Sequence, residues 1–175
     1  MIKNILLPLC IMLLVSCGND KGTGNDNNNV PATDAGKVYT PVQLNEKIMA
    51  IEASLQEPML KAEAEIKVRG GNGNIAGVAQ SAKAMEDTIQ LRLNEVKALS
   101  PVGVGGEDYK LVATRYFEHL KSIYTLYKEI AEAKEENIKI DKANQMQAVI
   151  SAQPAILTNL QLAQQKYAAD NGFVY

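Results

Sequence analysis

The chain has 175 residues, of which 46% are hydrophobic, and 18 Lys and Arg against 20 Asp and Glu give a formal net charge of −2 at pH 7. This length suits one domain with a substantial core. Because basic residues form no block anywhere in the chain, the sequence gives no support to nucleic-acid binding or to a polybasic membrane contact.

The N-terminus follows the order of an export signal. Lys3 precedes an apolar run, Ile5 to Val15, that has the length of a secretory signal and is too short to span a bilayer. The run leads into the letters LVSC, which resemble the lipobox of bacterial lipoproteins. The resemblance implies cleavage between Ser16 and Cys17 and attachment of a diacylglyceryl group to the Cys17 thiol. A plain signal peptide with a chance cysteine is the alternative.

If the lipobox is processed in this way, residues 1–16 are removed as a signal peptide and 159 residues remain. Cys10 leaves with the signal peptide and Cys17 is alkylated, so the mature chain has neither a free thiol nor a disulfide. Its stability must then come from packing alone. Each buried methylene of an acyl chain contributes about 0.8 kcal/mol to membrane binding, so two or three chains anchor the protein firmly.

Residues 17–39 comprise the expected lipidated cysteine and a polar stretch. From residue 18 to 38 the sequence is rich in Gly, Asn and Asp and has almost no apolar side chain. Such a segment cannot offset the entropy lost when it orders. We therefore expect a flexible tether with a reach of roughly a few tens of ångströms.

Residues 40–175 are expected to form the globular domain, and four amphipathic helices account for them because apolar residues recur at steps of three and four. The first begins at a capping box, with Thr40 as N-cap and Gln43 three residues later, and a Gly/Asn-rich turn ends it. On its exposed side we expect two ion pairs at i, i+4, Lys61–Glu65 and Glu63–Lys67. The expected helices span residues 40–69, 78–99, 108–136 and 141–171.

The boundary between the last two helices contains neither Gly nor Pro. A single helix over residues 108–171 would be about 95 Å long at 1.5 Å per residue, which is out of scale for a small domain. We therefore place a turn near Asn137, a residue type that tolerates left-handed backbone. Gly172 occupies the C-cap position after the last helix, and Phe173 is placed to make the accompanying hydrophobic contact.

These helices, without any alternating strand pattern, predict an all-α fold, an up-down-up-down four-helix bundle behind the tether. Pro58 and Pro154 interrupt the first and fourth helices near their middles and should kink or bulge them at about the same level. The two kinks either bend together around the core, which we favour, or frame a small pocket.

Three local patterns have a chemical interpretation that their context does not support. Residues 71–76, GNGNIA, fit the dinucleotide fingerprint, but that site needs a preceding strand and a helix is expected there. His119 is the sole histidine, and no Glu-x-x-His pair or zinc ligand set accompanies it, so we predict no metal. A solvated acidic end of the third helix is expected from Glu129, Glu132, Glu135 and Glu136.

Aromatic residues concentrate on the expected third helix, and they are its candidates for contacts with a partner. A rigid ring offers both area and, in tyrosine, a hydroxyl, which is why such residues are enriched in binding surfaces. The other interpretation, which we favour, places the rings in the core with their hydroxyls at its rim. The candidates are Tyr116, Phe117, Tyr124 and Tyr127.

The whole chain resembles helical-bundle lipoproteins of Bacteroidota-type and spirochaete envelopes. The resemblance rests on LVSC, the Asn/Asp-rich tether and the phrases YFEHLKSIYTLYKEI and QQKYAADNGFVY. Of these, the lipobox is specific, and the group brings no particular activity with it. Gly18 replaces the Asp that retains enterobacterial lipoproteins at the inner membrane, which implies the outer membrane, facing either the periplasm or the outside.

No catalytic triad can be built around the single histidine, and the mature chain keeps no thiol nucleophile. The sequence therefore predicts a non-enzymatic, membrane-anchored lipoprotein, without a cofactor, that binds a protein or envelope partner through one face of its bundle. The alternative is a bundle that binds a small ligand or metal near the Pro58/Pro154 kinks or His119. The sequence names neither the partner nor the oligomeric state.

Overall fold

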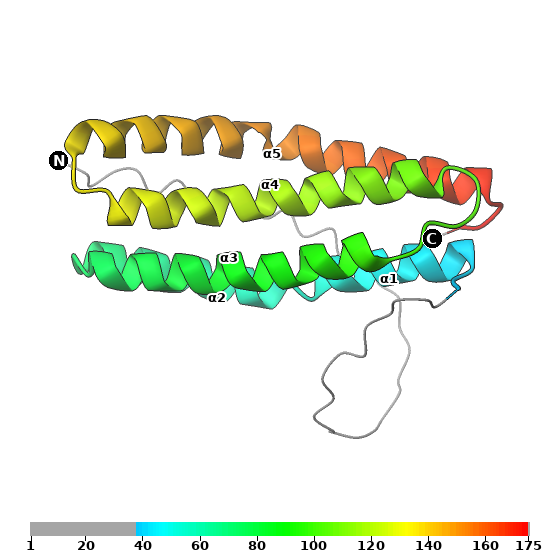
Figure 1. Ribbon diagram of the computed structural model, residues 1–175, viewed down its shortest axis with the longest axis horizontal. Coiled ribbons are helices and arrows are strands. Elements are labelled where there is room, and N and C mark those ends of the chain that lie inside the picture. Colours follow the sequence, from blue (N-terminus) through cyan, green and yellow to red (C-terminus); the bar gives the residue numbers. More distant parts are fainter. Residues whose placement is uncertain (1–37, 175) are drawn as a thin grey trace, which may run out of the picture.

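The structure is a computed structural model that describes residues 38–174, and these residues form helices and no strand (Figure 1). The expected signal peptide, Cys17 and the tether as far as residue 37 lie outside the described residues. The all-α prediction is confirmed. The helices are α1 (Pro41–Ala53), α2 (Gln56–Gly71), α3 (Ile75–Ala98), α4 (Gly106–Glu132) and α5 (Glu136–Asp170).

The α1–α2 segment provides the first of four antiparallel helical segments, and α3, α4 and α5 provide the other three. The close helix pairs are α3 with α4, α4 with α5, α2 with α3, and α1 with both α3 and α5. Figure 1 shows α4 running alongside α3 on one side and α5 on the other over most of the length of the molecule. Because the chain reverses at each connection, the expected up-down-up-down bundle is the observed architecture.

Pro58 divides the first helical segment. A proline has no backbone N–H, and its ring clashes with the carbonyl of residue i−4, which here is Ser54. Helix α1 accordingly ends at Ala53 and α2 begins at Gln56. The Leu55 side chain fills the core at the break and is 1% exposed. The expected interruption therefore occurs as a two-residue turn, in which Ser54 and Leu55 keep right-handed helical backbone, whereas Pro154 is accommodated inside α5.

The two prolines lie at about the same height in the bundle, as the sequence predicted. The Gln164 side chain on α5 donates to the Asn45 side-chain oxygen on α1 at 3.0 Å, which fixes the register of these helices. Pro58 follows Asn45 by 13 residues, and Pro154 precedes Gln164 by ten. At 1.5 Å per residue, the two prolines differ in height by about 5 Å.

The capping signals are confirmed at both ends of the domain. The Thr40 hydroxyl accepts from the Gln43 N–H at 3.3 Å, and the Gln43 side chain accepts from the Thr40 N–H at 3.0 Å. At the other end Gly172 is left-handed, with a φ of +71°. The Phe173 N–H donates to the carbonyl five residues back at 3.1 Å, as in a Schellman motif.

The turn between α4 and α5 lies a few residues before Asn137, which belongs to α5. Ala133 and Glu135 adopt extended backbone, with ψ of 130° and 133°. The turn therefore includes two residues with extended backbone. The prediction at Asn137 was wrong because no Gly or Pro marks the turn and its backbone needs no special residue type.

The hydrophobic core begins one residue before the expected domain boundary. Tyr39, which we assigned to the tether, is 5% exposed and belongs to the core cluster. The rest of the cluster comes from every helix, with its largest fully buried side chains on α1, α3, α4 and α5. Among residues 38–174, no helix is both long and apolar enough to span a bilayer.

Candidate functional site

A row of three polar pairs connects the α1–α2 segment with α4 across the bundle. On both sides the residues are spaced by seven and then by eleven positions, close to two and three helical turns, so each set lies on one helical face. The first and third segments of an up-down-up-down bundle run in the same direction, which keeps the two sets in register. We call this row the tyrosine ladder. It consists of Asn45–Tyr109, Glu52–Tyr116 and Glu63–Tyr127.

The first pair of the ladder is a buried hydrogen-bond junction. The Tyr109 hydroxyl donates to Asn45 Oδ1 at 3.1 Å, and Gln164 donates to the same oxygen. Asn45 and Tyr109 are each 2% exposed, so these bonds form away from water, where an unpaired polar group costs about 1–3 kcal/mol. The Tyr109 ring also stacks on Tyr167, with ring centroids 5.0 Å apart. This pair therefore joins α1, α4 and α5.

The second pair joins a carboxylate to a phenol. The Tyr116 hydroxyl donates to Glu52, and no Lys, Arg or His forms an ion pair with Glu52 in the part of the chain that the structure describes. Burial raises the pKa of Glu52, and the hydrogen bond from Tyr116 lowers it by less. Burial also raises the pKa of Tyr116, and the neighbouring Glu52 charge raises it further. The Tyr116 hydroxyl therefore favours the ionised form of Glu52, whereas the Glu52 charge favours the neutral form of Tyr116.

The third pair, Glu63–Tyr127, lies beside Tyr124, and two oxygens in this group have no partner. Glu63 Oε1 and the Tyr124 hydroxyl are both buried and have no hydrogen-bond partner. Burial raises the pKa of Glu63 to about 7. Burial and the Glu63 charge also raise the pKa values of Tyr124 and Tyr127, whose ring centroids lie 6.2 Å apart. Glu63 therefore faces two phenols instead of a cation.

The structure corrects the expected position of Glu63. Its side chain is half-buried against α4, and no ion pair to Lys67 exists among the described residues. The expected Lys61–Glu65 pair is also replaced. The Glu65 carboxylate lies 3.6 Å from the Arg69 guanidinium and accepts a hydrogen bond from the Ser81 hydroxyl at 2.7 Å. Spacing at i, i+4 identifies neighbouring positions on a helix but does not say whether they face solvent.

The four predicted partner-binding residues divide into two groups. Phe117 and Tyr124 are 0% exposed core residues, so they reach no surface in this conformation. Tyr116 and Tyr127 are half-buried and pack against the same core. These positions agree with the core interpretation of the rings. Contact with a partner stays a prediction for Tyr116 and Tyr127.

A second buried carboxylate, Glu86 on α3, has the opposite environment to Glu63. The Lys128 ammonium donates to one carboxylate oxygen at 2.5 Å, and the Thr125 hydroxyl donates to the other at 2.7 Å. Burial alone would raise the pKa of Glu86, but these bonds and the lysine charges lower it below its ordinary value. The pair holds α3 against α4 with its charge compensated.

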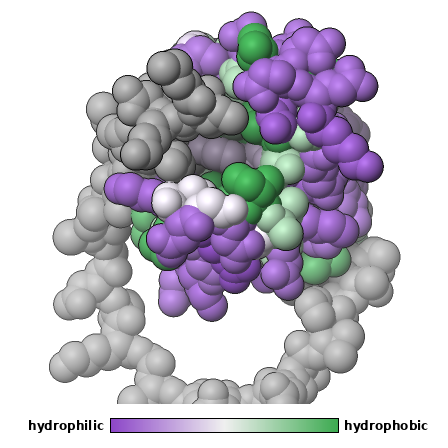
Figure 2. All heavy atoms as spheres, turned by 90° about the vertical axis from the view of Figure 1, so that its left-hand side faces the viewer, coloured by the Kyte–Doolittle hydropathy of each residue, from purple (hydrophilic) through white to green (hydrophobic). Residues whose placement is uncertain are grey.

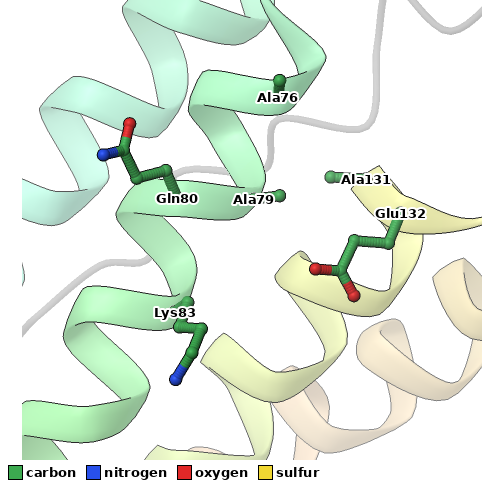
Figure 3. A pocket seen from close by; sticks show the side chains of 6 residues that line it. All are labelled: Ala76, Ala79, Gln80, Lys83, Ala131 and Glu132. Carbon is green, nitrogen blue, oxygen red and sulfur yellow. The ribbon is translucent and has the colours of Figure 1, made fainter.

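The described surface has an open hollow at the end of the bundle where the α2–α3 and α4–α5 turns lie. Its volume is about 480 Å³, and Figure 3 shows Ala76 and Ala79 of α3 opposite Ala131 and Glu132 of α4. Figure 2 faces this end of the molecule, where apolar residues appear between polar ones. The short alanine side chains leave this space between the two helices open to solvent.

A second hollow, of about 520 Å³, extends over α3, α4 and α5. Most of the residues that line it are of polar types, and they include Lys97 and Glu118, whose side chains form an ion pair at 2.8 Å. Neither hollow is lined by Pro58, Pro154 or His119, where the sequence suggested a pocket.

The remaining sequence patterns fall in ordinary structural positions. His119 is half-buried, burial lowers its pKa, and its Nε2 has no hydrogen-bond partner. Within residues 38–174, no three His, Cys, Asp or Glu side chains are placed to hold a metal ion. Residues 71–76 span the α2–α3 turn behind a helix. At the acidic end of α4, Glu129 pairs with Lys142 at 2.9 Å, and the other three predicted acids are exposed.

Asn45 and Glu52 were not among the candidate residues, and Glu63 was expected in an exposed ion pair, although these three residues supply the first half of the ladder. A signal for them is present, since the same spacing of seven and eleven residues recurs in Tyr109, Tyr116 and Tyr127. Their role was not predicted because a polar residue at the flank of an apolar face resembles part of the solvated face.

Comparisons of the chain with protein family models, with curated proteins and with solved structures found no match. The candidate site therefore rests on the geometry of the described residues.

Proposed function

We propose that the protein is a lipid-anchored envelope protein whose helical bundle is a non-enzymatic binding module for a protein or envelope partner. The lipobox ending at Cys17 carries this proposal. An acylated Cys17 places the chain on a membrane, and the absence of an Asp at position 18 favours the outer membrane. The polar residues after it then separate the bundle from the lipid surface.

The bundle suits a binding role because its frame is held by buried contacts and its surface offers hollows. The Asn45–Tyr109 junction and the Glu86–Lys128 pair fix α1, α3, α4 and α5 relative to one another. Tyr116 and Tyr127 are partly buried on this frame and are not enclosed by the core. A partner that covers them would bury aromatic area at little cost in side-chain entropy.

Site-specific photocrosslinking in the native host tests the binding role. A photoreactive phenylalanine analogue replaces Tyr116 or Tyr127 in the full-length protein, and the same analogue at Leu91 serves as the control. Leu91 lies on α3 and is 63% exposed. We expect one discrete crosslinked product, identified by mass spectrometry, from the tyrosine positions and not from Leu91. Equal products from all three positions, or none from any, would contradict the proposal.

A small polar ligand inside the bundle is a second candidate function, and the unpartnered oxygens of Glu63 and Tyr124 favour it. Buried polar groups in folded proteins are nearly always satisfied, by protein, water or ligand. Native mass spectrometry of the protein purified from its host should then show a bound small molecule that the Glu63→Gln variant lacks. A wild-type spectrum with no adduct would refute this candidate.

A further inference from the structure

We propose that the third pair of the tyrosine ladder acts as a proton-controlled latch, which holds α2 against the rest of the bundle at acidic pH and loosens it as pH rises. The proposal goes beyond the binding role and does not depend on it. It rests on the position of one carboxylate, the partners offered to that carboxylate, and the neighbours of the helix that carries it.

Glu63 lies on α2 at the flank that faces α4, where the titratable groups opposite it are Tyr124 and Tyr127. The hydrogen bonds between α2 and α3 do not involve Glu63. On α3, Ser81 donates to Glu65 of α2, and Gly77 and Gln80 accept from Arg69 of α2. Neither α3 nor α5 presents a described cation to Glu63, and on α2 itself the exposed Lys67 forms no ion pair with it. An ionised Glu63 would therefore have one buried oxygen, Oε1, without a compensating partner.

A protonated Glu63 fits this position better. The neutral carboxyl carries a proton that it can donate, and it lies near Tyr124, whose buried hydroxyl has no partner. Ionisation removes that donor and leaves a partly buried negative charge beside two phenols that themselves resist ionisation. The charge can be relieved when α2 moves outward and the carboxylate meets water.

Helix α2 is suited to such movement because it has few close neighbours. Its close helix neighbour is α3, whereas α1 approaches both α3 and α5, and α4 lies between α3 and α5. The break at Ser54 and Leu55 separates α2 from α1, and the Gly-containing turn before α3 ends it on the other side. Loosening α2 therefore leaves the Asn45–Tyr109 junction and the Glu86–Lys128 pair in place.

The direction of the pH effect follows from the proton balance. The pKa of Glu63 is about 7 while α2 is closed, whereas it returns to about 4.5 when α2 opens and the carboxylate meets water. The population of the open form should then rise up to about tenfold per pH unit between these values, and level off above pH 7. Acidification closes the latch, and neutral pH loosens it.

Hydrogen exchange measured by mass spectrometry between pH 5 and 8 tests the latch on the full-length protein in detergent. After correction for intrinsic exchange, the protection of residues 56–71 should fall several-fold per pH unit up to pH 7, while the protection of α4 changes little. Glu63→Gln should abolish this slope. Glu57→Gln, an exposed change on the same helix, should keep it.

Two results would overturn the latch. One is equal loss of protection in α2 and α4, which would indicate global unfolding. The other is an unchanged slope in Glu63→Gln. If this variant does not fold, the comparison of α2 with α4 in the wild-type protein decides the question alone.

Discussion

At the scale of single residues, Glu63 and Glu86 show how the same side chain acquires opposite properties. Both are inside the bundle, but Glu86 accepts from Lys128 and Thr125, whereas Glu63 faces only phenols among the described residues. The pKa of Glu86 is lowered and that of Glu63 is raised. Burial disfavours the charged form in both, so the presence of an ammonium partner decides the sign.

The pKa shifts of Glu63 and Glu86 affect the pH dependence of stability in opposite directions. The native state holds the Glu63 proton more tightly than the unfolded chain, so its contribution to stability is complete below pH 4.5 and is lost as pH rises through about 7. The Glu86 contribution is present above pH 4.5 and is lost as pH falls through its lowered pKa. Stability should therefore decline on both sides of a weakly acidic optimum.

The variant Glu63→Gln isolates the first of these effects. The neutral amide cannot ionise, so the unfolding free energy of the variant should fall less than that of the wild type between pH 5 and 7.5. Urea denaturation followed by circular dichroism measures this difference. Glu57→Gln removes the same charge from an exposed site and should leave the wild-type profile unchanged. A Glu63→Gln profile that follows the wild type would refute the assignment.

Removing single hydroxyls should separate satisfied from unsatisfied tyrosines. The Tyr124 hydroxyl is buried without a partner, so above pH 7, where Glu63 is ionised, Tyr124→Phe should be neutral or stabilise the fold by about 1 kcal/mol. The Tyr109 hydroxyl bonds to Asn45, so Tyr109→Phe should cost about 1–3 kcal/mol. Chemical denaturation of the two variants measures the contrast. Equal destabilisation by both would show that Tyr124 has a partner.

At the scale of helices, the end of α5 is tied to the connection between α3 and α4 by Asn171. Its side chain accepts from the Val104 N–H at 3.0 Å and donates to the Val104 carbonyl at 2.9 Å. Gly103 is required beside it, because its φ is +74° and a Cβ there would lie 2.3 Å from Asn171 Oδ1. One side chain thus closes a contact between segments that are far apart in sequence.

The substitution Asn171→Ala should break this tie. It removes both bonds to Val104, so we expect a loss of about 1–3 kcal/mol in the unfolding free energy. Asn159→Ala, at an exposed position of the same helix, is the matched control and should change stability by less than about 0.5 kcal/mol. Thermal and urea unfolding measure both. Equal effects would show that the tie contributes nothing specific.

Sequence reasoning located the helices where a local signal exists. Thr40 with Gln43, Gly172 and Pro58 each act through the backbone of their own turn, so their effects could be predicted from neighbouring residues alone. The α4–α5 turn could not be placed exactly, because Ala133 and Glu135 adopt an extended backbone that any residue tolerates. Boundaries without Gly, Pro or a capping residue depend on tertiary packing.

At the scale of the whole molecule, the ladder was harder to predict than the fold. Helical periodicity identified the apolar face of each segment, and four such faces determine a bundle. Pairing Glu63 with Tyr127 requires knowing that the α1–α2 segment and α4 lie across the core in one register. That register depends on contacts such as Asn45 with Tyr109 and Gln164, which no single segment encodes.

The proposed membrane anchor determines how the molecule is presented. With the lipid at Cys17 and the core beginning at Tyr39, the bundle is attached at the start of α1. The end with the alanine-lined hollow lies at the opposite end of the bundle from this attachment (Figure 1). Attachment at the start of α1 would therefore leave this hollow accessible to a partner.

The intact mass of the protein extracted with detergent from its native membrane tests the anchored bundle most directly. We expect a chain that lacks residues 1–16 and carries a diacylglyceryl group on Cys17, and we expect Cys17→Ser to abolish both changes. An unmodified chain that starts at Met1, or a mature chain without lipid, would contradict the account.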